Sequence, residues 1–144
     1  MSDSEVTGRL ERLRTIPLFA QLPKEALERV LACATEFEAA RGHVLLQPNR
    51  PGAGLFVIED GTVEVELPNR KIELGPGEFV GELALLAENA THVARVHATS
   101  EIRCLAISRD DFDRLLADEP GLAVSMLKVL ASRLSEAGRK LASS

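Results

Sequence analysis

One stretch of the chain brings together residue types that bind a phosphorylated sugar. Gly81 and Glu82 follow a Gly-Pro-Gly turn at 75–77 and precede the apolar run 83–86. This order predicts a turn, a single short helix and then a strand. Gly81 lets a ligand approach the backbone closely, and the first N–H groups of a helix that begins at Glu82 favour an anion because they have no intrahelical partners. Since the Glu82 carboxylate accepts hydrogen bonds from hydroxyls, the stretch suits a sugar phosphate.

This stretch resembles the phosphate-binding cassette of the cyclic nucleotide-binding domain family. The opening of the cassette is present as Phe79-Val80-Gly81-Glu82-Leu83-Ala84-Leu85-Leu86. The segment 16–27, Ile-Pro-Leu-Phe-Ala-Gln-Leu-Pro-Lys-Glu-Ala-Leu, is similar to the opening helices of the same family. The resemblance covers about residues 10–138. It implies a mainly β fold with flanking helices, namely an eight-stranded jelly roll, or double-stranded β-helix.

By this resemblance, the ligand site consists of Gly81, Glu82, Leu83, Ala84, His92, Val93, Val65, Ile72 and Leu74. In the family, the carboxylate at the Glu82 position accepts the ribose 2′-hydroxyl, and backbone groups beside it hold ribose and phosphate. Val65, Ile72 and Leu74 fall at barrel-wall positions near the purine. Each assignment has a plainer alternative. Glu82 suits the positive end of a helix as a capping carboxylate, and the apolar residues suit a turn or the core.

The second half of the cassette departs from the family pattern. In the register set by the alternating Ala94, Val96 and Ala98, His92 stands where the family has a phosphate-binding arginine. Arginine is permanently charged and grips a phosphodiester with two N–H groups, whereas an unperturbed histidine is mostly neutral at pH 7. Losing the charge-assisted pair costs about 2–4 kcal/mol, or about 30- to 1,000-fold in affinity. His92 is therefore either a pH-sensitive anion ligand or a solvated loop histidine.

Neighbouring positions do not restore the missing charge. Val93 offers no hydroxyl, although some members of the family have serine or threonine there. Arg95 and His97 alternate with the small apolar residues, so we expect both to point away from the ligand. In family members of the catabolite-activator type, two hydroxyl residues of the long helix cap the purine. The matching positions here are Ala137 and Gly138.

The middle of the chain predicts a β structure. Expected strands lie near 35–39, 43–47, 54–59, 62–67, 70–74, 93–99 and 102–107, with Gly- or Pro-containing turns between most of them. In one of them Val63, Val65 and Leu67 alternate with glutamates, so one face is buried and the other is wet. Many short strands of this kind are typical of a sandwich or barrel.

Helices are expected before the strands, within a single domain. An apolar repeat over 10–16 predicts a short first helix that ends near Pro17. A second helix begins near Pro23, since proline suits an early helical position, and continues to Ala34. A chain of 144 residues is long enough for one core. The expected parts are a flexible N-terminus at 1–9 and one domain at 10–144, comprising helices at 10–34, a jelly roll at 35–107 with its cassette at 79–93, and C-terminal helices at 108–141.

The C-terminal helices carry the clearest helical signals. Ser108 and Asp111 form a capping pair for a helix that stops before Pro120, and a last helix runs from there to about Leu141. The last helix has two apolar stripes: Ala123, Leu127, Leu130, Leu134, Ala137 and Leu141, and beside them Leu122, Met126 and Val129. One stripe can pack on the barrel and the other can meet a partner helix as a coiled-coil seam. Because related sensors dimerise through this helix, we expect a homodimer or an unknown protein partner; the alternative is that the whole apolar face packs within the chain.

Composition excludes several classes of function. A net charge of −5 disfavours binding to nucleic acid, and phenylalanine is the only aromatic residue, so base-stacking platforms are absent. No apolar run approaches the roughly 18 residues of a membrane span, and no signal peptide is recognisable. We expect a cytoplasmic protein in which Cys33 and Cys104 are reduced core thiols; a disulfide between them is the alternative.

Catalysis finds no support in the sequence. The histidines at 43, 92 and 97 lack metal-ligand spacing, no nucleophile motif is present, and the 75–77 turn is not a P-loop. We therefore expect no enzyme, metal or cofactor. The leading hypothesis is a stand-alone regulatory sensor without a DNA-binding domain, with cAMP or cGMP, or alternatively another small anion or nucleotide, as the ligand of its pocket. The alternative is an interaction and dimerisation module that kept the fold and lost the nucleotide.

Overall fold

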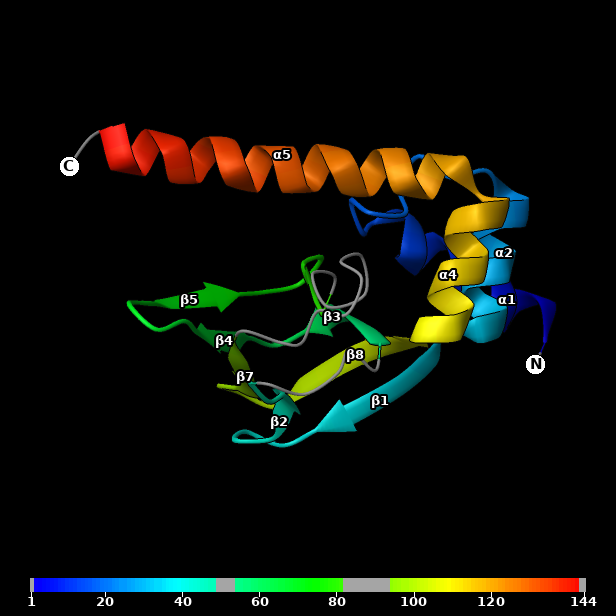
Figure 1. Ribbon diagram of the computed structural model, residues 1–144. Coiled ribbons are helices and arrows are strands. Elements are labelled where there is room, and N and C mark those ends of the chain that lie inside the picture. The colour runs from blue at the N-terminus through cyan, green and yellow to red at the C-terminus, as the bar shows by residue number, and fades with distance from the viewer. Residues whose placement is uncertain (1, 49–53, 82–93, 143–144) are drawn as a thin grey trace.

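The computed structural model describes the backbone of residues 2–48, 54–81 and 94–142, and the side chains as far as residue 135. Two four-stranded antiparallel sheets form a jelly roll (Figure 1). Helices α1, α2 and α4 gather at one end of the sheets, and α5 runs from that end across the top of the molecule. The mainly β jelly roll with flanking helices is the fold class that the sequence predicted.

One sheet, here called sheet A, has the strand order β1-β8-β3-β6. Its strands are β1 (Thr35–Ala39), β8 (Ile102–Ser108), β3 (Gly54–Asp60) and β6 (Phe79–Val80). The strand β6 was not predicted from the sequence, because two residues are too few to show an alternating pattern. It pairs with β3 at the edge of the sheet, where Val80 lies opposite Phe56.

The other sheet, sheet B, has the order β2-β7-β4-β5. Its strands are β2 (Val44–Leu46), β7 (Arg95–Ala98), β4 (Val63–Glu66) and β5 (Lys71–Leu74). In β4, Val63 is fully buried, and Glu64 and Glu66 pair with cations. The predicted division of this strand into a buried and a wet face is therefore confirmed.

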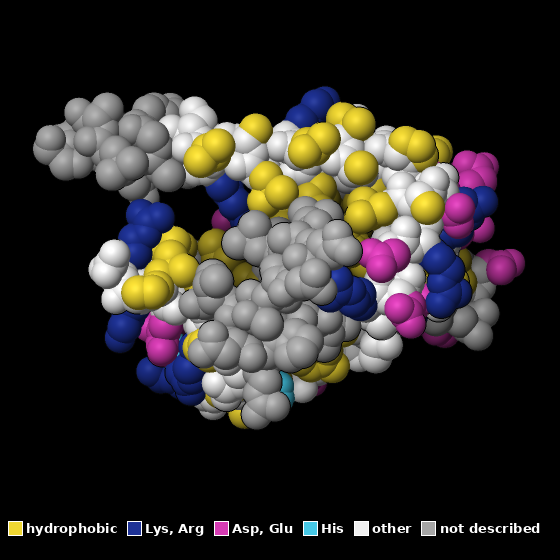
Figure 2. Space-filling view, in the orientation of Figure 1, with side chains coloured by type: hydrophobic (Ala, Val, Ile, Leu, Met, Phe, Trp, Pro, Cys, Tyr) yellow, Lys and Arg dark blue, Asp and Glu magenta, His cyan; other side chains and the backbone are white. Residues whose placement is uncertain are grey.

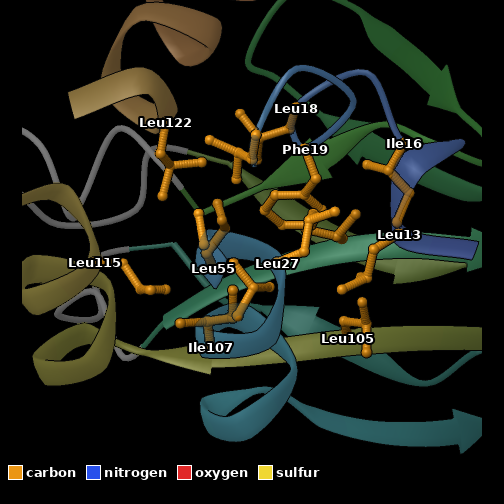
Figure 3. Packing of buried hydrophobic residues seen from close by; sticks show 14 of the residues in the cluster. Leu13, Ile16, Leu18, Phe19, Leu27, Leu55, Leu105, Ile107, Leu115 and Leu122 are labelled. Carbon is orange, nitrogen blue, oxygen red and sulfur yellow. The ribbon is translucent and has the colours of Figure 1, made fainter. Parts of the chain in front are cut away.

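The central strands of sheet A, β3 and β8, are buried on both faces, which is why they are strongly apolar. Against the helices, the buried residues labelled in Figure 3 are Leu13, Ile16, Leu18, Phe19, Leu27, Leu55, Leu105, Ile107, Leu115 and Leu122. Between the sheets, the buried cluster is Leu46, Ile58, Val63, Val80, Val96, Ala98, Ile102 and Cys104. The strand β8 contributes to both clusters by alternation, since Cys104 faces one and Leu105 the other.

Helix α1 (Asp3–Arg14) begins inside the 1–9 segment that we expected to be flexible. The Ser2 hydroxyl accepts a hydrogen bond from the Glu5 N–H at 3.3 Å and caps the helix. Acidic residues occupy its first turn and arginines its last turn, which suits the helix dipole. The first turn carries little apolar pattern, so the prediction started the helix too late.

The other helices have the predicted positions. Helix α2 spans Lys24–Cys33, α4 spans Arg109–Asp118 and α5 spans Pro120–Ala142. The predicted cap of α4 is confirmed, since the Ser108 hydroxyl accepts from the Asp111 N–H at 3.2 Å. Both cysteines are free thiols, as predicted, and burial raises the pKa of Cys104 to about 11.

A chain of close backbone contacts joins β6 to the rest of sheet A. At Gly81, which directly follows β6, φ is +99°, and a Cβ atom there would collide with the carbonyl oxygen of Gly54. A Cβ atom on Gly54 would in turn lie 2.5 Å from the carbonyl oxygen of Ile107. Glycine is therefore required at both positions, because no side chain fits between these three backbones.

A half-buried carboxyl group lies in sheet A at a register shift in β3. The shift falls between Ile58 and Asp60, and the intervening Glu59 has a buried Oε1 atom with no hydrogen-bond partner in the described part of the chain. Burial raises the pKa of the Glu59 carboxyl, and the nearby Glu36 raises it further, while Arg103 acts in the opposite direction. The folded state therefore disfavours the ionised carboxylate.

We predict that Glu59→Gln raises the thermal unfolding midpoint at pH 7. Because the folded pKa lies above the unfolded value near 4.5, the contribution of Glu59 to stability is fully present below the unfolded pKa. It is lost as the pH rises through the folded pKa. Thermal melts of both proteins from pH 4 to pH 8 should show an advantage for the variant that shrinks toward pH 4. The exposed Glu38→Gln is the control, and an equal shift in that control would contradict the explanation.

We predict that Gly81→Ala lowers the free energy of unfolding by about 2–4 kcal/mol, through the strained positive φ and the collision with Gly54. The matched control is Gly8→Ala within α1, where a Cβ atom meets nothing within 4 Å. That control should raise stability by about 0.5–1 kcal/mol, because alanine is the better helix former. Urea unfolding measures both values, and a Gly81→Ala protein as stable as the parent would contradict the close packing.

Candidate functional site

The structure describes four of the nine predicted site residues. Gly81 lies at the end of β6, Val65 lies on β4, and Ile72 and Leu74 lie on β5. The remaining five, Glu82, Leu83, Ala84, His92 and Val93, lie outside the described residues. Their assignments stay predictions.

The turn before β6 is fastened to β3 by backbone hydrogen bonds. The N–H of Gly77 donates to the carbonyl of Ile58 at 2.7 Å, and the N–H of Ile58 donates to the carbonyl of Glu78 at 2.8 Å. The Glu78 side chain reaches back and accepts from the N–H of Gly75 at 2.7 Å. Together with the Gly81 contact, these bonds give the opening of the predicted cassette a fixed position on sheet A.

The predicted wall residues share one face of the β4–β5 hairpin. Val65 lies directly opposite Ile72, and Leu74 lies opposite the buried Val63. Directly opposed residues of an antiparallel pair point to the same face. Val65 and Leu74 also pack against the cluster between the sheets. The structure thus brings these three residues together, half-buried, in an arrangement that suits both a purine wall and the edge of the core.

The other face of sheet B carries an ion-pair network. Arg95 Nη1 donates to Glu66 Oε1 at 3.0 Å, and His97 Nδ1 lies 3.2 Å from the same oxygen. Ala94, Val96 and Ala98 are buried on the inner side. The prediction that Arg95 and His97 point away from the small apolar residues is confirmed, so Arg95 cannot replace the cassette arginine from this position.

Ligand atoms of Glu64, Glu66 and His97 lie within 4.8 Å of one another, which is a spacing that a metal ion can use. However, both carboxylates already have cationic partners: Arg95 lies 3.0 Å from Glu66, and Lys71 Nζ lies 3.6 Å from Glu64. These ion pairs account for the cluster, and we assign no metal to it.

Helix α5 contacts the strand that leads into the cassette. Arg133 Nη2 donates to the carbonyl oxygen of Phe79 at 3.2 Å. The guanidinium carbon of the same side chain lies 4.5 Å from the centroid of the Phe79 ring. The sequence analysis did not single out Arg133, because an arginine beside an apolar stripe is ordinary in a helix and its partner lies 54 residues away.

The two apolar stripes of α5 have different environments. Leu122 and Met126 are almost fully buried against the helical end of the core, and Val129 packs against the same cluster. The other stripe is divided, since Leu127 is 66% exposed and Leu134 is 75% exposed, whereas Leu130 packs against the cluster. Figure 2 shows hydrophobic side chains along the surface of this helix. The prediction that one stripe packs on the domain is confirmed.

Proteins named as potassium channels are similar in sequence to most of this chain. A putative potassium channel protein of Rhodopseudomonas palustris is 31% identical over 82% of the chain, which covers 29% of that protein. A cyclic nucleotide-gated potassium channel of Mesorhizobium japonicum is 30% identical over 82% of the chain, covering 33% of that channel. The chain thus spans about a third of the length of these relatives. Within the described residues, the structure contains no helix with the length and apolar character needed to cross a membrane.

Solved structures share the fold. The catabolite activator protein of Thermus thermophilus matches 87% of this chain and 61% of its own, at 28% identity and a TM-score of 0.74. The regulatory subunit of a cAMP-independent protein kinase A from Trypanosoma brucei matches 89% of this chain and 47% of its own, at 24% identity and a TM-score of 0.75. The sequence profile of the cyclic nucleotide-binding domain matches residues 36–119. The chain therefore belongs to the cyclic nucleotide-binding domain family, a family of non-catalytic sensor domains, as the cassette motif predicted.

Proposed function

We propose that this domain is a regulatory sensor whose pocket takes a cyclic nucleotide, cAMP or cGMP, with low affinity. The observation that carries the proposal is the retained frame of the cassette. Gly81 stands at the end of β6 with φ +99°, held against Gly54 and directly before the predicted ligand Glu82. The wall residues Val65 and Ile72 are paired on one face. The name of the Mesorhizobium relative, a cyclic nucleotide-gated channel, supports the ligand class.

The affinity is set by the cassette position that holds His92. The predicted contacts of Gly81, Glu82, Leu83 and Ala84 remain available to ribose and phosphate. A neutral imidazole replaces the permanent charge and the paired N–H groups that an arginine gives a phosphodiester. We therefore expect binding weaker by about 30- to 1,000-fold than an arginine-containing cassette provides.

A second candidate is an interaction module that works through α5 without a nucleotide. The exposed stripe on this helix favours it, because Val124, Leu127 and Leu134 are 48%, 66% and 75% exposed. Their spacing of three and then seven residues suits a coiled-coil seam, and a second copy of this chain is the occupant that such a self-complementary stripe fits. The fold does not choose between the candidates, since the Trypanosoma structure with the same fold is described as cAMP-independent.

Calorimetric titration with cAMP and cGMP tests the first candidate. We predict that the parent protein binds weakly and that His92→Arg tightens binding by about 30- to 1,000-fold, because it restores the charged pair. The double variant His92→Arg/Val93→Ser adds a hydroxyl beside it and should bind at least as tightly. The control is His92→Arg/Glu82→Ala, which should lose most of the gain, since the ribose contact is removed.

Either of two results would contradict this proposal. Tight binding by the parent would show that the cassette needs no arginine. If neither the parent nor any variant binds cAMP or cGMP, the nucleotide pocket is ruled out and the second candidate, the interaction module, is favoured.

We predict that the protein is a dimer and that Leu127→Glu/Leu134→Glu shifts it toward monomer. Removing two exposed leucines from an apolar seam weakens association by at least about tenfold. Light scattering with size-exclusion chromatography over a concentration series measures the shift. The control is Ser132→Glu, an exposed position on the opposite side of the same helix. A monomeric parent, or equal effects of both substitutions, would contradict a seam at this stripe.

A further inference from the structure

The carbonyl of Phe79 lies on the free edge of sheet A. The carbonyl of Glu78 accepts from the N–H of Ile58, so residue 78 faces β3. Successive residues of a strand direct their backbone groups to opposite sides, and Phe79 therefore faces away from β3. Among the strands that the structure describes, β6 is the last of its sheet, and none of them pairs with this carbonyl. Arg133 of α5 donates to it at 3.2 Å instead.

The same guanidinium also covers the Phe79 ring. Its central carbon lies 4.5 Å from the ring centroid, within the range of a cation–π contact. The ring is 1% exposed, so the cation rests on a side chain that is fixed in the core. A planar guanidinium can stack on a ring with its face while donating from its edge, which a lysine ammonium cannot do. Two contacts of one side chain thus hold one residue of β6.

Arg133 lies beyond the buried first turns of α5. Leu122 and Met126 anchor these turns with 1% and 2% of their surfaces exposed, and Val129 and Leu130 pack against the same cluster. At the β6 end, Gly81 is two residues from Phe79 and is held against Gly54. The two contacts of Arg133 therefore join β6 to α5.

We propose that Arg133 is a positioning residue that couples helix α5 to β6, so that the position of the helix and the geometry of Gly81 change together. The coupling rests on the proposed function only in assigning Gly81 to the ligand pocket. It regulates that pocket because a ligand which prefers one position of β6 must also prefer one position of α5.

Hydrogen exchange measured by mass spectrometry on the nucleotide-free protein tests the coupling. We expect Arg133→Gln to speed exchange roughly tenfold in two separate peptides, one covering 75–81 and one covering the outer part of α5. That size corresponds to one charge-assisted hydrogen bond together with a cation–π contact. Arg133→Lys should restore part of the protection, since it keeps the cation without the planar fork. Lys128→Gln removes an exposed cation from the same helix and should leave both peptides unchanged.

Loosening confined to α5, or an unchanged profile in both peptides, would overturn the coupling. If hydrogen exchange in β8 also becomes faster in Arg133→Gln, that variant is unfolding. The coupling is then judged from Arg133→Lys, by whether exchange becomes faster in the 75–81 peptide and not in β8. Calorimetry separates this inference from the proposed function. A protein that binds no nucleotide and still shows joint loosening has the coupling without the ligand. A protein that binds nucleotide and shows no joint loosening has the ligand without the coupling.

Discussion

The close stacking of three backbones, at Gly81, Gly54 and Ile107, is the constraint on which the candidate site depends. Gly81 contacts the carbonyl of Gly54, and Gly54 contacts the carbonyl of Ile107 in the neighbouring strand. Because these contacts leave no room for a side chain, glycine is required at both positions, and β6 packs closely against the centre of sheet A. The hydrogen bonds from Gly77 to Ile58 and from Ile58 to Glu78 act at the other end of β6. The predicted cassette therefore starts at a strand that is packed and hydrogen-bonded against the core of the fold.

The proposed function depends on what adjoins this strand. On one side, the predicted ligand groups begin immediately after Gly81, and Val65 and Ile72, the predicted wall residues, are paired on the hairpin of sheet B. On the other side, Arg133 joins Phe79 to the long helix α5. The outer stripe of that helix exposes Leu127 and Leu134. The proposed sensing at the pocket and the proposed association at the helix would then be connected through Arg133.

Local signals explain how much of this could be predicted from the sequence. Alternation in Val63–Glu66, the Ser108 cap and the apolar stripes of the last helix each depend on residues within a few positions of one another, and each was recovered. The strand β6 and the start of α1 at Asp3 were missed, because two buried residues and a polar first turn carry no periodic signal. The contact of Arg133 with Phe79 joins residues 54 positions apart, and no local pattern records it. In the site, the motif indicated nine residues. The structure describes four of them and places Val65, Ile72 and Leu74 on one face of the β4–β5 hairpin, and the roles of all nine remain predictions.

Nuclear magnetic resonance of ¹⁵N-labelled His92→Arg protein during a titration with cAMP tests the central claim, that pocket and helix respond as one unit. The account predicts that the amide signals of Phe79 and Gly81 and those of α5 around Arg133 shift together, with the same midpoint in nucleotide concentration. Shifts at Gly81 that leave α5 unchanged, or no shift in either region, would contradict it.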